Sequence, residues 1–174
     1  MDKELAVQSL TDTMAKFTAY IGKRLPKDVK SKLIELKTLE TNPLAKSIYD
    51  SMDENQEAAD RLNRPSCQDT GVIQYFVEAG AHFPLLGELQ EILREATEEA
   101  TRTGPLRHNA VETFDEKNTG TNTGTQIPWL DWRIVPEQDT CTIDVYMAVC
   151  GCTLPGSAKV LMPGQGYEGV AEFV

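Results

Sequence analysis

Several side chains that could bind a ligand or take part in catalysis lie in connections between the predicted helices and strands. Cys67, Gln68 and Asp69 are adjacent in one connection. Arg107 and His108 are adjacent in a second. Thiols, carboxylates and guanidinium groups can ligate metals, transfer protons and bind anions, and a rigid scaffold often holds such groups on loops. These positions suggest a site without defining its chemistry, because an unpaired cysteine is also common in protein cores.

The cysteine pattern argues against disulfides and against a complete zinc site. Cys67 stands alone, while Cys150 and Cys152 form a C-x-C pair in a Gly- and Pro-containing connection over residues 150–157. In a reducing compartment, an even number of cysteines is not evidence for disulfide pairing. Neither arrangement is the paired C-x-x-C of a zinc knuckle, so we expect no structural zinc site built from this chain alone.

Composition and charge narrow the class of protein. The 174 residues include 27 acidic and 17 basic side chains, which gives a net charge of −10. Because Lys and Arg drive phosphate binding, this balance argues against a nucleic-acid or anionic-membrane partner. No segment approaches the ~20 apolar residues of a membrane-spanning helix, and residues 1–4 lack the features of a signal peptide. We expect a single domain over residues 1–174, located in the cytoplasm.

The first hundred residues are expected to be mainly helical. Apolar residues at steps of three and four predict helices over about 11–23, from Pro26 onward, and over 84–103. Asn42 followed by Pro43 places a cap before a proline at the first helical position. This pair predicts the start of a further, long helix.

The pattern changes after these helices. Residues 72–77 are β-branched and aromatic and predict a strand, and residues 127–135 and 140–149 predict two more. The turn at 136–139 predicts that the last two strands form a hairpin. The predicted fold class is therefore α+β, with a helical N-terminal half followed by a small, mainly antiparallel sheet on which helices pack.

The end of the sequence has helical spacing without a helix stop. Tyr167, Val170, Phe173 and Val174 fall on one helical face, and neither a glycine nor a polar tail follows them. We therefore expect a chain truncated at its C-terminus, or an end that another polypeptide covers.

Three sequence blocks resemble, in the same order, the alpha region of the iron-sulfur class I fumarase and tartrate dehydratase family. Residues 64–71, Arg-Pro-Ser-Cys-Gln-Asp-Thr-Gly, are similar to the family's cluster-ligating motif. Residues 105–112 and 118–122, Pro-Leu-Arg-His-Asn-Ala-Val-Glu and Asn-Thr-Gly-Thr-Asn, resemble the next two blocks. Residues 83–90 and 152–163 are most similar to the tartrate dehydratase alpha subunits of that family. The resemblance covers essentially the whole chain.

The resemblance implies a hydro-lyase that adds or removes water across a carbon–carbon bond of a dicarboxylate. Members of the family use a [4Fe-4S] cluster held by three cysteines, which leaves one iron open to act as a Lewis acid on the substrate. By this resemblance Cys67 is the first cluster ligand, in its thiolate form.

The resemblance also implies roles for the neighbouring residues. Gln68 matches a substrate-binding position and can hydrogen-bond a substrate oxygen. Asp69 matches a position that binds substrate and takes part in proton transfer, although a carboxylate there could instead form only an Asx turn. Arg107 matches the arginine that binds a substrate carboxylate, with a surface ion pair as its alternative. His108 is expected to be mainly structural.

Two features depart from the family's pattern. The family's second and third cluster cysteines lie beyond the position of Val174, so by the family's scheme this chain supplies one ligand. Where the family has three successive glycines near the substrate, this chain has Val149, Cys150 and Gly151. Only Gly151 carries over as a substrate-binding position. Whether Cys150 and Cys152 replace the missing ligands stays open.

Three hypotheses about function follow. The favoured one is part of a tartrate dehydratase alpha subunit, which dehydrates L-tartrate to oxaloacetate and pairs with a beta subunit in a heterotetramer. The nearest alternative is a class I fumarase alpha subunit that interconverts fumarate and malate. The third is a non-catalytic truncated fragment. The chain alone is expected to be inactive, because the family's cluster needs three cysteines.

Overall fold

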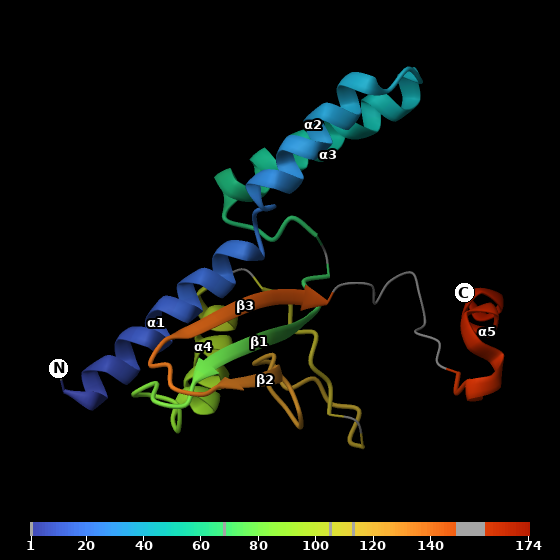
Figure 1. The fold of residues 1–174 in the computed structure, drawn as a ribbon. Helices are drawn as coiled ribbons and strands as arrows, with labels where there is room; N and C mark the ends of the chain where they lie inside the picture. The colour runs from blue at the N-terminus through green and yellow to red at the C-terminus, as the bar shows by residue number, and fades with distance from the viewer. Residues whose placement is uncertain (1, 68, 105, 113, 149–158) are drawn as a thin grey trace.

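The computed structural model describes residues 2–67, 69–104, 106–112, 114–148 and 159–174 (Figure 1). None of the helices in these residues is long and apolar enough to cross a membrane. The elements follow one another as α1 (Lys3–Ile21), α2 (Lys27–Leu39), α3 (Pro43–Leu62), β1 (Val72–Gly80), α4 (Leu89–Thr103), β2 (Trp129–Val135), β3 (Cys141–Ala148), the short 3-10 turn η1 (Pro163–Gln165) and α5 (Gly166–Phe173).

The three strands form a mixed sheet in the order β2-β1-β3. The central strand β1 runs parallel to β2, with Gln74 opposite Trp129, and antiparallel to β3, with Val72 opposite Ala148. The segment β1-α4-β2 is therefore a crossover unit in which a helix connects two parallel strands.

One face of this sheet forms the core with α1 and α4. Alternate residues of β1 point into it, and Tyr75 and Ala79 are fully buried. α4 contributes Leu89, Leu93, Ala96 and Ala100 at helical spacing, and α1 contributes Met14 and Ala15. The hydroxyl of Tyr75 bridges the two helices, 3.1 Å from Thr18 Oγ1 and 3.0 Å from Thr97 Oγ1.

The hairpin of α2 and α3 extends away from the sheet (Figure 1). We call residues 27–62 the α2–α3 arm. The side chain of Asn42 caps α3 by accepting the N–H of Leu44, as the Asn42-Pro43 pair predicts. Among the residues of the two helices only Ala59 is buried. The arm therefore does not contribute to the core described above.

The α+β class predicted from the sequence is confirmed, while three details differ. α1 begins at Lys3, eight residues before the predicted start at about residue 11. α4 begins at Leu89 instead of residue 84, because successive turns occupy residues 83–88. The predicted hairpin between the last two strands is wrong, since β1 lies between them and the sheet is mixed. The connection at 136–140 instead crosses the end of β1, where Gln138 O accepts the N–H of His82 at 2.9 Å. At this crossing a Cβ on Gly80 would lie 2.2 Å from Gln138 O, so the close approach requires glycine.

Candidate functional site

The carboxylate of Asp69 is held by hydrogen bonds from two loop segments, 69–71 and 106–112. Its Oδ1 accepts the backbone N–H of Gly71 at 2.8 Å and the side-chain amide of Asn109 at 2.7 Å. The same Asn109 amide donates to the carbonyl of Gly71 at 3.3 Å. The bond to Gly71 is an Asx turn, and Gly71 has a φ of 72°, a conformation that favours glycine. Asp69 therefore forms an Asx turn and also accepts a second bond that the turn does not require, and its role in binding substrate remains a prediction.

Thr70 ties the same two segments together through the backbone of Arg107. The buried Thr70 hydroxyl accepts the N–H of Arg107 at 3.0 Å. The guanidinium of Arg107 is exposed, so the backbone is anchored while the charged end is accessible. The arrangement holds the main chain of Arg107 close to the segment that carries Asp69.

Asn122 anchors the segment at 106–112 to helix α4. It is almost fully buried and has a φ of 59°, which asparagine tolerates better than most residues. Its Oδ1 accepts the N–H of Asn109 at 2.7 Å, and its Nδ2 donates to the carbonyl of Arg107 at 2.7 Å and to Thr101 Oγ1 on α4 at 3.1 Å. One side chain thus fixes both Asn109 and Arg107 to the C-terminal end of a core helix.

The block at 118–122 folds back along residues 108–111. Val111 and Asn118 form an antiparallel bridge, and the Asn118 amide donates to the carbonyl of His108. The imidazole of His108 is exposed, and hydrogen bonding in this region involves its backbone. The expectation that His108 is mainly structural remains a prediction.

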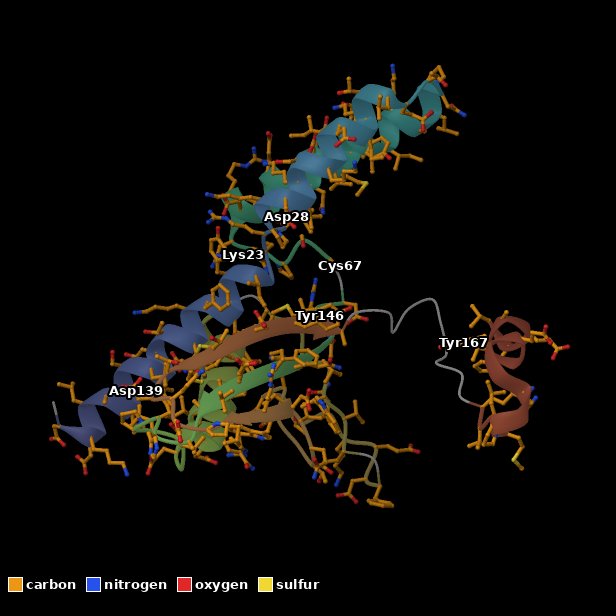
Figure 2. The ribbon with its side chains drawn as sticks, in the orientation of Figure 1. Lys23, Asp28, Cys67, Asp139, Tyr146 and Tyr167 are labelled. Carbon is orange, nitrogen blue, oxygen red and sulfur yellow. The ribbon has the colours of Figure 1, made fainter. Side chains whose placement is uncertain are left out.

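Cys67 lies in the connection between α3 and β1 with its thiol exposed (Figure 2). It borders a cleft of about 480 Å³ whose other walls come mainly from the end of α1 and from the α2–α3 arm. An exposed thiol on a loop suits a metal ligand. Within the residues that the structure describes, however, no three Cys, His, Asp or Glu side chains group closely enough to hold a metal ion. These residues therefore fit one ligand of a cluster and not a complete cluster site.

Cys141 differs from Cys67 in its surroundings. It lies on β3 opposite Ala79 and packs half-buried against the core. Burial raises the pKa of the Cys141 thiol, which favours the neutral form over the thiolate that a metal requires. Cys67 is thus the better ligand candidate of the two.

Four other candidate positions, Gln68, Cys150, Gly151 and Cys152, lie outside the described residues. Conversely, sequence reasoning assigned no role to Thr70, Asn109 or Asn122, although all three lie in the blocks at 64–71, 105–112 and 118–122. In the sequence these three residues are recognisable only as polar residues in turn-rich regions. Such residues predict turns, but they do not predict which turns bond to one another.

The arrangement brings two chemical functions onto adjacent segments. Asp69 presents a carboxylate whose position is fixed by two donors to one oxygen. Arg107 presents a guanidinium, which binds carboxylates through paired N–H groups. Such a pair can bind an anionic substrate and orient a hydroxyl or proton beside it.

The chain is similar to known proteins over almost its whole length. Residues 11–174 match the family model described as fumarate hydratase (Fumerase). The chain is 58% identical over 173 residues to L(+)-tartrate dehydratase subunit alpha of Escherichia coli (strain K12), covering 99% of this chain and 57% of that protein. The protein of the same name from Shigella sonnei (strain Ss046) matches with the same 58% identity over 99% of this chain and 57% of its own length. The chain therefore spans somewhat more than half the length of these relatives.

Proposed function

The chain belongs to the fumarate hydratase (Fumerase) family, and on that premise we propose that it is part of the alpha subunit of a hydro-lyase that converts L-tartrate to oxaloacetate. In this reaction one carbon of tartrate loses a proton and its neighbour loses the hydroxyl, which leaves as water. The resulting enol tautomerises to oxaloacetate. Tartrate is favoured over fumarate because the relatives that cover almost all of this chain are named as tartrate dehydratase subunits.

The observation that carries the proposal is the network joining Asp69 to Asn109 and, through Asn122, to the backbone of Arg107. In the proposed reaction Asp69 orients the substrate hydroxyl or handles the proton, and Arg107 binds a carboxylate of the substrate. Gln68 and Gly151 complete the proposed substrate contacts through an amide side chain and a backbone N–H. A network that holds Asp69 and the backbone of Arg107 in register lowers the entropy cost of binding a substrate at two points.

The proposed cofactor is a [4Fe-4S] cluster to which Cys67 contributes one thiolate. When bound, such a cluster supplies a Lewis-acid position for a substrate hydroxyl, which is a poor leaving group in water. The exposed thiol of Cys67 is the described group that suits this role. The remaining ligands are proposed to come from outside the described residues.

The proposed partner is a second, beta subunit, because the relatives are named as alpha subunits. We further propose that the active assembly is a heterotetramer that works in the cytoplasm.

A chimera tests the proposal directly. The matched region of the Escherichia coli alpha subunit is replaced by this chain, and the chimera is produced with its beta subunit and reconstituted anaerobically with iron and sulfide. We expect oxaloacetate to form from L-tartrate, with iron and sulfide bound in the ratio of a [4Fe-4S] cluster.

The same assay separates the alternatives. Malate formation from fumarate with negligible turnover of tartrate would identify a fumarase alpha subunit instead. A chimera that folds and binds the beta subunit but turns over neither substrate would support the non-catalytic alternative. The chain on its own, reconstituted in the same way, is expected to be inactive toward both substrates.

A further inference from the structure

The α2–α3 arm exposes its apolar side chains to solvent. Leu39, Leu44 and Ile48 are 68%, 70% and 55% exposed, and none of the residues of α2 is buried. Figure 2 shows the arm with side chains standing out along it, from Asp28 near its base outward. Apolar residues grouped on one projecting element indicate an interaction surface.

The two helices of the arm do not close a core between them. Part of the cleft of about 480 Å³ lies between them, bordered by Leu33 from α2 and by Tyr49 and Met52 from α3. A two-helix hairpin without a packed apolar interior is marginally stable in water, since most helix stability in proteins comes from burying an apolar face. Covering its apolar side chains with a second surface would therefore stabilise the arm.

The turn at the tip of the arm is nevertheless well defined. The carboxylate of Glu40 accepts the N–H groups of Thr41 and Asn42, both at 2.8 Å, and these bonds lower its pKa. Asn42 in turn caps α3. A fixed turn holds α2 and α3 as one preformed surface and reduces the entropy cost of docking.

The charges of the arm indicate what kind of partner fits. α2 carries four lysines and two acidic residues, whereas α3 carries five acidic residues and two basic ones. The arm thus has one basic and one acidic helix, so the basic helix of one copy is complementary in charge to the acidic helix of a second copy. The whole arm carries six basic and eight acidic side chains, so its net charge of −2 is small, and the opposite charges of the two helices can pair between two copies.

We propose that two copies of this chain associate through their arms, with α2 of each copy packed against α3 of the other around a two-fold axis. The product is a four-helix bundle in which the apolar side chains of both arms form a shared core. This contact does not depend on the hydro-lyase activity proposed above.

Charged groups are available for this pairing. Within the described part of the chain, Lys27 and Lys30 on α2 form no ion pair, and neither do Glu54 and Glu57 on α3. Lys27, Lys30 and Glu57 border the cleft of about 480 Å³ described above. In the proposed bundle the lysines of one copy face the acidic helix of the other.

The size of the surface indicates a reversible contact. Two helices of 13 and 20 residues make a face roughly 20 Å wide and 20 to 30 Å long, so both copies together bury on the order of 1,000 Å². That area is at the lower limit for a specific interface. We therefore expect a monomer–dimer equilibrium that depends on protein concentration.

A charge exchange tests the proposal. The α2-reversed variant carries Lys27→Glu with Lys30→Glu, and the α3-reversed variant carries Glu54→Lys with Glu57→Lys. Sedimentation equilibrium of each purified chain should show dimerisation weakened by about 100-fold or more, because like charges then face each other. An equimolar mixture, with one variant labelled with nitrogen-15, should form mixed dimers in native mass spectrometry.

The α3-reversed variant is the more informative of the two. Each Glu→Lys change adds two units of charge, so its net charge moves from −10 to −6 and general repulsion decreases. Loss of dimers in this variant would therefore report a specific contact. Glu91→Lys with Glu95→Lys on α4 is the matched control, since it gives the same net charge and should leave dimerisation unchanged.

Circular dichroism of each variant should show the helix content of the wild type, which separates loss of the contact from loss of the fold. A wild-type chain that stays monomeric at every concentration would overturn the proposal. A chain that binds a different polypeptide but not a second copy of itself would overturn it as well. So would folded reversed variants that dimerise like the wild type, or a mixture of the two that gives no mixed dimers.

Discussion

The side-chain amide of Asn109 lies 2.7 Å from Oδ1 of Asp69, although the two residues are 40 positions apart in the sequence. This bond makes the position of the Asp69 carboxylate depend on the fold of the segment at 106–112. Because Asn122 bonds both to the N–H of Asn109 and to the carbonyl of Arg107, the loops that carry Asp69 and Arg107 form one structural unit.

Replacing Asn109 tests this unit through stability. Asn109→Ala removes the bonds to Asp69 and to the carbonyl of Gly71, and should lower the free energy of unfolding by about 1 to 3 kcal/mol. Asn109→Asp should cost more at neutral pH, because it places a second carboxylate beside Asp69. Its deficit relative to Asn109→Ala should shrink in acid, where one carboxylate is protonated. Urea unfolding at neutral and acidic pH measures both effects, and equal deficits at every pH would contradict the contact.

Asn122 combines a conformational and a hydrogen-bonding requirement, which two variants separate. Both Asn122→Ala and Asn122→Gly lose the bonds to Asn109, Arg107 and Thr101, and should destabilise the fold by about 2 to 4 kcal/mol. Alanine should be worse than glycine by about 1 kcal/mol, because only glycine accepts the φ of 59° without strain. Equal values for the two variants would show that backbone conformation does not matter at this position.

Much of this architecture follows from local pattern, and the rest depends on contacts distant in sequence. The start of α3 at Pro43 follows from a cap and a proline that act within one turn. The pairing of β1 with β2 could not be predicted in the same way. The short turn at 136–139 favours a hairpin of β2 with β3, whereas the observed parallel pairing requires a crossover through α4. Similarly, Asp69 could be selected from its motif, whereas the role of Asn109 required knowledge of how two turn-rich loops meet.

Tyr75 should make the fold sensitive to alkali. Burial raises the pKa of the Tyr75 phenol, although its hydrogen bonds to Thr18 and Thr97 act in the opposite direction. The folded state therefore disfavours the phenolate, so stability is fully present below the unfolded pKa of about 10 and decreases as the pH rises above it.

Tyr75→Phe isolates this contribution. It should cost about 1 kcal/mol at neutral pH through the lost hydrogen bonds. Above about pH 10 it should lose stability less steeply than the wild type, because the other alkaline groups are common to both proteins. Thermal unfolding as a function of pH measures the two slopes, and parallel slopes would show that Tyr75 ionises as easily in the folded state as in the unfolded state.

Cys67 should be required for the cluster of the chimera. Cys67→Ala removes the exposed thiol and should abolish the visible absorbance of the cluster and the bound iron, while association with the beta subunit remains. Cys141→Ala is the matched control, since Cys141 packs against the core and its thiol is kept neutral. It should lower stability and leave the absorbance intact. A Cys67→Ala chimera that still bound four irons would exclude this residue as a ligand.

Arg107 should act through the geometry of its side chain as well as its charge. Its backbone is fixed by Thr70 and Asn122, so a substitution of the exposed side chain should leave the fold intact. Lysine keeps the positive charge but cannot offer two parallel N–H groups to a carboxylate. In the chimera, Arg107→Lys should therefore reduce kcat/KM for L-tartrate by about 10- to 1000-fold, equivalent to ~1.4 to 4 kcal/mol of transition-state binding.

Arg102→Lys on α4 is a suitable control, because Arg102 is an exposed arginine paired only with Glu99 of its own helix among the described contacts. A kcat/KM that is unchanged in Arg107→Lys, with unfolding also unchanged, would return Arg107 to the role of a surface residue.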